Sequence, residues 1–231
     1  MKRFWKEVSI ERADSGWQVM LDGRAIRTQA GNPQIVPTRA LAELLASEWT
    51  AQGEKIDPAA FPARDLADYA IDMIAPGPGP TIAKVLRYAE SDTLCYRADP
   101  DEPLHKHQWE VWEPIVTAFE VREDVRMERA SGILHKPQPA ETLAALRARL
   151  TALDPFTLGA LEAMTTLSAS LCVGLSALDP GADAAALWDA AELEETWQAK
   201  LWGVEPLAEE RRQKRQRDFM RAVRFAKAAT S

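Results

Sequence analysis

The stretch "APGPGP" at residues 75–80 is the strongest breaker of regular structure in this sequence. Three prolines and two glycines within six residues disfavour both helix and strand. The segments before it read largely as short strands, and the segments after it repeat their apolar residues with a helical period of 3.6. We therefore predict an α+β protein, with a small β-rich domain at residues 1–80 that includes one or two helices, and a larger all-α helical domain at residues 81–231.

Strand and turn signals dominate the beginning of the chain. The runs "FWKEVSI" and "WQVML" are rich in β-forming side chains, and Asp22-Gly23 predicts a tight hairpin into "RAIRT". A helix is expected at residues 38–53, with Thr38 as its N-terminal cap. Trp49 falls on the apolar face of that helix, so we interpret it as a structural anchor. A second helix is expected at residues 64–74.

Helical periodicity continues through most of the remaining chain. The apolar segment at residues 156–178 has about the length of a bilayer span. Glu162 and six Ser/Thr residues within it favour a buried central helix, so we expect no stable membrane insertion. Trp109, Trp112, Val116 and Phe119 are predicted to share the apolar face of their helix. The expected helices are residues 81–95, 103–119, 140–153, 155–178, 183–202 and 207–228.

Charge and cysteine usage limit the classes of partner. The net charge of −7 argues against a general nucleic-acid or anionic-membrane binder. Six acidic residues and no basic one lie between Asp179 and Glu195, whereas residues 203–231 carry eight Lys/Arg against four Asp/Glu. The two segments can therefore pair internally. Cys95 and Cys172 stand in apolar surroundings and fit buried thiols in a reducing compartment.

Sequence motifs for enzymatic or metal chemistry are scarce. The chain has no phosphate-binding loop, no dinucleotide fingerprint, no HExxH and no GxSxG. Its three histidines, His105, His107 and His135, are the candidates for a metal site, but an HxH pair on a helix does not point to one side. We therefore predict no metal and no cofactor.

The segment "LEETWQAKLWG" at residues 193–203 is the most informative stretch for function. On a helix, Glu194 and Gln198 are one turn apart and can project together, beside the adjacent Glu195. Trp197 shares a face with apolar residues and is interpreted as an anchor, whereas Trp202 is a candidate contact residue. Three readings remain from these residues: a docking surface, a carboxylate-lined catalytic cleft around Glu194 and Glu195, or an ordinary amphipathic helix paired with the basic segment.

A series of motifs resembles a known family. The stretch "LDGRAIRTQAGNPQIVPTRALAELLASEWTAQGEKIDP", followed by "DTLCYRA", "GILHKPQP", "LDPF" and "LEETWQAKLWG", is similar to the assembly chaperones of the ATP synthase catalytic head. Among them it looks like the member that binds the α subunit, which is found in mitochondria and alphaproteobacteria. The resemblance spans nearly the whole chain.

The resemblance implies a non-enzymatic chaperone that holds the unassembled α subunit until β subunits replace it. It also implies a β-rich N-terminal domain, an α-helical C-terminal domain, and an important glutamate before the Trp-Gly pair, which corresponds here to Glu194 or Glu195. Eukaryotic relatives carry more acidic residues where this chain has Thr196. Glu194, Glu195, Gln198 and Trp202 are the predicted partner-binding residues. The charged beginning of the chain is not typical of a signal or transit peptide, so we expect a bacterial cytoplasmic protein. We also expect a monomer.

Overall fold

The computed structural model describes residues 1–132 and 136–231, and these residues form two compact units. The first unit comprises residues 1–78, 154–160 and 221–231, and the second comprises residues 79–153 and 161–220. Strands are concentrated near the N-terminus and helices dominate the rest, so the predicted α+β class is confirmed. The division at residue 80 stays a prediction, because the compact units place two later segments with the first unit.

A three-stranded antiparallel sheet lies in the first unit, in the order β1-β2-β3. Val8 pairs with Leu21 and Ala13 with Gly16, so the first two strands form a full hairpin. The predicted Asp22-Gly23 turn joins the second and third strands, with positive φ values of 48° and 75° that suit a tight hairpin. The strands are β1 (Val8–Ala13), β2 (Gly16–Leu21) and β3 (Arg24–Ala25).

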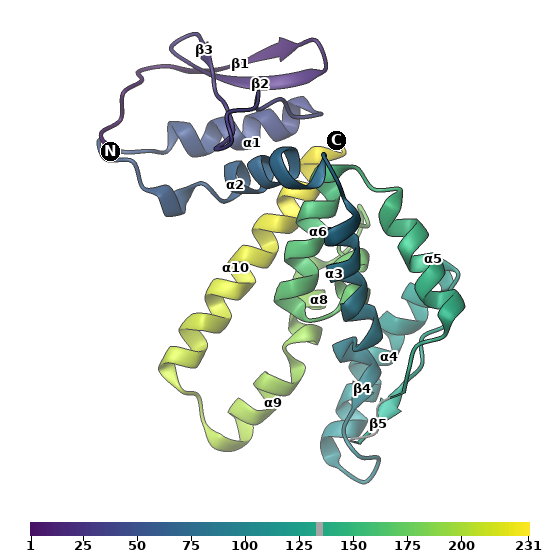
Figure 1. The fold of residues 1–231 in the computed structure, drawn as a ribbon. Coiled ribbons are helices and arrows are strands. Elements are labelled where there is room, and N and C mark those ends of the chain that lie inside the picture. The colour runs from purple at the N-terminus through teal and green to yellow at the C-terminus, as the bar shows by residue number, and fades with distance from the viewer. Residues whose placement is uncertain (133–135) are drawn as a thin grey trace. The chain divides into compact units, whose positions relative to one another are not determined.

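Helix α1 (Arg39–Thr50) packs against this sheet and covers one of its faces (Figure 1). Its predicted cap is present, because the Thr38 hydroxyl accepts a 3.0 Å hydrogen bond from the Leu41 amide. The expected second helix is an α-helix that continues into a π-helical turn. The remaining elements of this part are the 3-10 turn η1 (Pro58–Ala60), α2 (Pro62–Tyr69) and the π-turn η2 (Ala70–Ile74).

Helices build most of the second unit, and the side chains of Trp112 and Trp188 are fully buried in its core. Two short strands of this unit pair in parallel, Tyr96 with Ala130 and Arg97 with Ser131. From residue 79 onward the elements in chain order are α3 (Gly79–Glu90), η3 (Thr93–Cys95), β4 (Tyr96–Arg97), α4 (Pro103–Glu123), β5 (Ala130–Ser131), α5 (Ala140–Thr151), α6 (Pro155–Ser168), α7 (Leu171–Ser176), α8 (Ala184–Ala191), α9 (Leu193–Trp202) and α10 (Pro206–Ala229). The start of α6 and the end of α10 belong to the first unit. Within the described ranges, no helix has both the length and the apolar character that a membrane crossing requires.

The apolar run at residues 156–178 is two helices rather than the single one that was expected. Ala169 adopts a left-handed φ of 51°, which ends α6. The Ser170 hydroxyl then caps α7 by accepting a hydrogen bond from the Val173 amide. The buried carboxylate of Asp92 holds this break, because it accepts hydrogen bonds from the Ser170 hydroxyl (2.7 Å) and the Cys172 amide (2.9 Å).

Three further expectations about helices were wrong. The helix predicted at residues 81–95 ends at Glu90, and residues 93–95 form the separate turn η3. The helix predicted at residues 183–202 is interrupted at Glu192, whose φ and ψ of −89° and 10° separate α8 from α9. Trp109 does not share the buried face of Trp112, because its side chain is 52% exposed and lies under the guanidinium of Arg97. The break at Glu192 and the exposure of Trp109 depend on packing between segments, which the periodicity of apolar residues does not report.

Candidate functional site

Helix α9 is attached to its surroundings by few buried contacts. Leu193 is its one buried residue, and the exposure of its side chains increases toward the C-terminal end. Glu194 and Glu195 occupy the first turn and Lys200 the last, an order that favours the helix because it opposes the helix dipole. The helix ends at Gly203, whose φ of 90° is a backbone conformation that residues with a side chain rarely adopt.

Glu194 faces α4 rather than solvent. One of its carboxylate oxygens accepts a 2.5 Å hydrogen bond from the side-chain amide of Gln108. Gln108 is itself fully buried, and its own oxygen accepts a 2.8 Å hydrogen bond from the amide of Ala98. Burial raises the pKa of Glu194, and the hydrogen bond from Gln108 offsets part of that rise. Glu194 therefore ties α9 to α4.

Glu195 belongs to an ionic cluster with α10. Arg215 lies 3.1 Å from the Glu195 carboxylate and 2.9 Å from that of Glu192, and it also donates to the Leu167 carbonyl at 3.0 Å. The guanidinium is centred 5.6 Å from the ring of Trp188. Glu195 and Glu192 thus form the ion pairs between the acidic segment and the basic helix, whereas Glu194 contacts Gln108 on α4.

Glu192 has the most strongly shifted pKa in this cluster. Its side chain is only 3% exposed, and one of its oxygens has no hydrogen-bond partner among the described residues. Burial raises its pKa to about 7, although the attraction of Arg215 acts in the opposite direction. Arg215 is shared among Glu192, Glu195 and a backbone carbonyl, so its charge does not fully compensate the loss of hydration.

Trp197 and Gln198 take different positions on α9. The Trp197 ring is half-buried and lies 5.6 Å from the ring of His107 on α4, at an interplanar angle of 36°. This contact favours the anchor role that was expected for Trp197. Gln198 is exposed one turn after Glu194, whose carboxylate is turned toward Gln108, so the two side chains do not form a common polar pair.

The turn between α9 and α10 presents large apolar side chains to solvent. We call this set the apolar elbow: Leu201 (62% exposed), Trp202 (85%), Val204 (63%) and Leu207 (62%). An exposed apolar group of this size is unusual on a soluble protein unless it contacts another molecule. Trp202 was predicted as a contact residue, but its three neighbours were missed, although "LWGVEPL" holds all four within seven residues.

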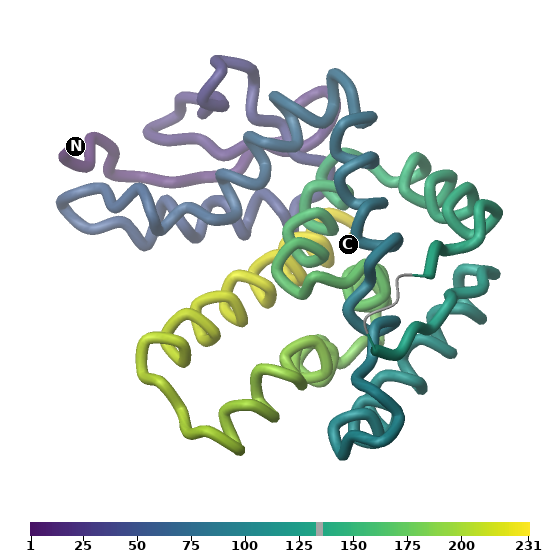
Figure 2. The backbone as a smooth tube through the Cα atoms, turned by 60° about the horizontal axis from the view of Figure 1, so that its bottom comes forward, coloured from purple at the N-terminus to yellow at the C-terminus, as the bar shows by residue number. Residues whose placement is uncertain are grey.

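A groove of about 1290 Å³ adjoins the apolar elbow. Figures 1 and 2 show α9 and α10 as two arms joined by the turn that carries the elbow. Trp197, Gln198 and Trp202 line the groove from α9, and Arg211 and Arg215 line it from α10. Residues of α4 and α8 contribute the remainder of its wall. The arrangement suits a segment of another chain laid between two helices.

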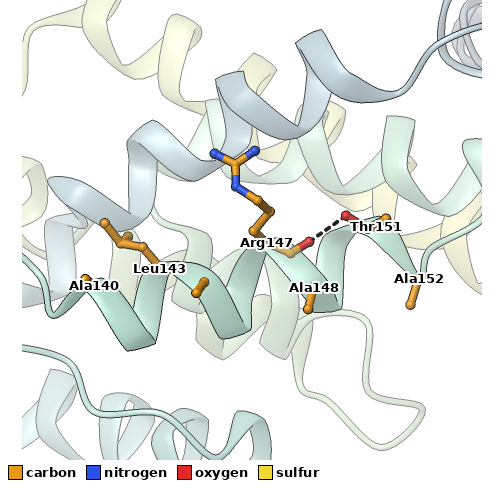
Figure 3. Close-up of a pocket in the computed structure, with 7 residues that line it drawn as sticks. Ala140, Leu143, Arg147, Ala148, Thr151 and Ala152 are labelled. Carbon is orange, nitrogen blue, oxygen red and sulfur yellow. Dashed lines mark hydrogen bonds between the residues drawn. The ribbon is translucent and has the colours of Figure 1, made fainter.

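A second hollow, of about 730 Å³, lies along α5 and does not have the character of a site (Figure 3). Every side chain that lines it comes from this one helix, and most are alanines. The hydrogen bond drawn there joins the Thr151 hydroxyl to the Arg147 carbonyl at 2.8 Å, which is a local contact within the helix. Within residues 1–132 and 136–231, no polar group of a second element lines it.

The metal and catalytic readings find little geometric support. His105 and His107 stack on different tryptophans, and His135 lies outside the described residues. Glu194 and Glu195 contact α4 and α10 respectively, so they do not face a common cleft. Among the described residues, the possible metal ligands that come close together are Asp92, Cys95 and Cys172, all buried.

The Asp92 carboxylate is already engaged by hydrogen bonds from three donors, which are the Leu94 and Cys172 amides and the Ser170 hydroxyl. Burial raises the pKa of Asp92 and that of the Cys172 thiol. A protonated thiol is a poor metal ligand and a poor nucleophile. This cluster is therefore a structural connection between η3 and α7.

Trp49 lies in the first unit, far along the chain from these helices. Its half-buried ring is 5.0 Å from that of Trp5 and 4.6 Å from that of Phe61, and the guanidinium of Arg64 lies 5.9 Å from it. Its ring nitrogen is buried and has no hydrogen-bond partner in the part of the chain that the structure describes. The aromatic cluster favours the anchor role that the sequence predicted for Trp49.

Comparison with known proteins places this arrangement among known chaperones. Residues 2–120 match the model of a family described as ATP12 chaperone protein. The mitochondrial protein atp12 of Schizosaccharomyces pombe is 25% identical over 214 residues, which cover 87% of this chain and 74% of that protein.

Two solved bacterial structures are similar over almost the whole chain. Atp12 of Paracoccus denitrificans is 35% identical, with a TM-score of 0.94, and the match covers 99% of this chain and 98% of that one. The Atu1473 protein of Agrobacterium tumefaciens is also 35% identical, with a TM-score of 0.93 over 98% and 85% of the two chains.

Proposed function

This chain belongs to the ATP12 chaperone family, and we propose that it holds the unassembled α subunit of ATP synthase until β subunits replace it. As a member of that family it is an assembly chaperone of ATP synthase and not an enzyme. The catalytic reading of Glu194 and Glu195 is therefore set aside. The α subunit as the specific client is our proposal, and it rests on the family resemblance together with the surface described above.

The apolar elbow is the observation that carries this proposal. A subunit that awaits assembly exposes apolar interface, which promotes aggregation. A chaperone for such a subunit needs an accessible apolar surface of its own. On the apolar elbow the largest side chain is Trp202, which is 85% exposed. Aromatic side chains bury much area with little loss of conformational entropy, so they suit such a contact.

The connections beneath α9 hold the elbow in place. Glu194 fixes the first turn of α9 to α4, and Arg215 joins Glu195 to α10. We assign Gln198 and Trp202 to contact with the client, and Glu194 and Glu195 to contact or to support of the contact surface. Binding by surface complementarity requires neither nucleotide hydrolysis nor a metal. Release follows by mass action when the client meets a partner that binds the same interface more tightly.

The site of action belongs to the same proposal. We place the protein in the bacterial cytoplasm, in keeping with its similarity to proteins of Paracoccus denitrificans and Agrobacterium tumefaciens. We propose that it binds its client as a monomer, so that one apolar elbow serves one unassembled subunit.

An aggregation assay tests the client. Isolated α subunit is diluted from denaturant with and without an equimolar amount of this protein, and light scattering is followed in the absence of nucleotide and metal. We expect scattering to be suppressed by this protein and to remain high with an equal mass of serum albumin. Equal aggregation in all samples would refute the proposed client.

A further inference from the structure

The surface beside the apolar elbow is positively charged in an otherwise acidic protein. Between Lys200 and Arg217 the sequence has six Lys/Arg residues against three glutamates, although the whole chain carries a net charge of −7. The excess is therefore local. It includes and flanks the apolar elbow, so apolar and basic character coincide on one part of the surface.

Several of these cations are neutralised within the protein. Arg215 pairs with Glu192 and Glu195, Arg212 pairs with Glu209 at 2.8 Å, and Arg211 lies 3.7 Å from Glu205. The bonds from Arg212 and Gln213 lower the pKa of Glu209 to about 2, so this carboxylate is ionised at neutral pH. These pairs account for Glu205 and Glu209, the two carboxylates that line the groove from the turn and from α10.

The remaining cations are exposed and form no ion pair with any described residue. They are Lys200 on α9 and Lys214 and Arg217 on α10. Lys214 and Arg217 line a depression of about 580 Å³ together with Leu207 of the elbow, Arg211, Gln213 and the exposed Glu210, so its lining holds three cations and one carboxylate. Arg211 also borders the groove between α9 and α10, so the basic depression continues the groove. We call Arg211, Lys214 and Arg217 the basic face.

We propose that the apolar elbow and the basic face together dock an amphipathic, acidic segment of the client, with apolar side chains on the elbow and carboxylates on Lys214 and Arg217. The inference rests on the proposed chaperone function and adds the chemistry of the bound segment. Exposed cations beside an apolar surface favour carboxylates and repel other cations, and they accelerate encounter with an acidic partner. A basic amphipathic segment would bring like charges together.

A pair of synthetic peptides tests the chemistry without the client. The first has leucine on one helical face and glutamate on the other, and its twin has lysine in place of every glutamate. Binding of each labelled peptide to the full-length protein is measured by fluorescence anisotropy. We expect the glutamate peptide to bind on the order of tenfold more tightly than the lysine peptide. The difference should shrink at high salt, because exposed charges are screened. Equal binding of both peptides, or no binding of either, would overturn the inference.

Matched variants locate the binding surface. Val204→Ser removes an apolar side chain from the elbow, and Val121→Ser makes the same change at a comparably exposed position on α4. Lys214→Gln with Arg217→Gln removes two charges from the basic face, and Arg224→Gln with Lys227→Gln removes two charges further along α10. We expect about a tenfold loss of glutamate-peptide binding in the first member of each pair and no loss in the second. Equal losses within a pair would refute the location.

The same variants separate this inference from the proposed client. If wild-type protein suppresses aggregation of the α subunit and the elbow and basic-face variants suppress it equally well, the inference fails and the client stands. If wild-type protein gives no protection while the peptide results hold, the client fails and the docking chemistry stands. A dimer that becomes a monomer in Trp202→Ser, measured by light scattering after gel filtration, would show that a second copy occupies the surface and would overturn the inference.

Discussion

The side-chain amide of Gln108 on α4 donates a 2.5 Å hydrogen bond to the carboxylate of Glu194 on α9. These residues are 86 positions apart in the chain, and Gln108 has no exposed surface. Glu194 is therefore both a candidate contact residue and part of the support beneath the apolar elbow. The two roles make different predictions.

The support role predicts a loss of stability only when the acceptor is removed. Glu194→Gln keeps an oxygen for Gln108, and its neutral side chain suits a site where burial already raises the pKa of Glu194. We expect its unfolding free energy to stay within about 1 kcal/mol of wild type, whereas Glu194→Ala should lose about 1–3 kcal/mol by leaving a buried donor unpaired. Urea unfolding at neutral pH measures both. Equal stability of all three proteins would contradict the support role.

The contact role predicts a functional loss without a stability loss. If the Glu194 charge meets the client, Glu194→Gln should weaken protection of the α subunit while its unfolding stays near that of wild type. Glu195→Gln is the comparison, because it removes an exposed charge that is already paired with Arg215. Loss of protection only in the Glu195 variant would assign the contact to that carboxylate, and full protection in both would remove the pair from the docking surface.

Glu192 predicts a pH dependence of stability with a definite sign. Its pKa is raised from 4.5 to about 7 in the folded protein, so the folded state binds this proton more tightly than the unfolded state. Its contribution to stability is present below pH 4.5 and is lost as the pH rises through about 7. Because Glu192→Gln cannot ionise, we expect the variant to gain on the order of 3 kcal/mol relative to wild type between pH 4.5 and pH 8.

Urea unfolding of both proteins across this pH range measures the difference and cancels the other titrating groups. Glu195→Gln, assayed in parallel, controls for the loss of a carboxylate from the same cluster. A constant difference between the Glu192 variant and wild type would rule out the raised pKa.

Trp49 predicts a cost in stability. Its half-buried ring packs against Trp5 and Phe61, so Trp49→Ala should lose about 3 kcal/mol of unfolding free energy, toward the lower end of the range for aromatic truncation. Trp202→Ala makes the same substitution at 85% exposure and should change stability by less than about 0.5 kcal/mol. If Trp49→Ala melts like wild type but fails to protect the α subunit, the ring belongs to a contact surface instead.

Gly174 predicts an effect of close packing. A Cβ atom added there would lie 2.4 Å from the Thr165 hydroxyl oxygen and 3.0 Å from a methyl carbon of Leu161. Because both neighbours are buried, Gly174→Ala should destabilise the protein by about 1–3 kcal/mol even though alanine favours a helix. Gly181→Ala is the control, since no atom of the described residues lies within 4 Å of the added atom. Thermal unfolding of the two variants measures this difference. Equal melting temperatures would contradict the predicted packing effect at Gly174.

Elements with local signals were predictable from the sequence. The Asp22-Gly23 turn and the Thr38 cap occur where they were expected, because each depends on the conformational preferences of residues within one turn of the chain. The α+β class followed from the change of period across residues 75–80 for the same reason. Trp202 was predicted to be a contact residue, and that role stays a prediction, although its 85% exposure leaves the side chain accessible.

The connections between segments required the tertiary structure. Nothing in the sequence distinguishes Glu194 from Glu195, yet one faces Gln108 and the other faces Arg215. The break at Ala169 also lacks a local signal, since alanine favours helix, and it is held by Asp92 from a distant segment.

The sequence by itself thus determined the α+β class, the approximate positions of most helices and strands, and the Thr38 cap. The tertiary structure decided which residues remain exposed and which carboxylate is buried, because burial depends on neighbours that are far apart along the chain and meet only after folding.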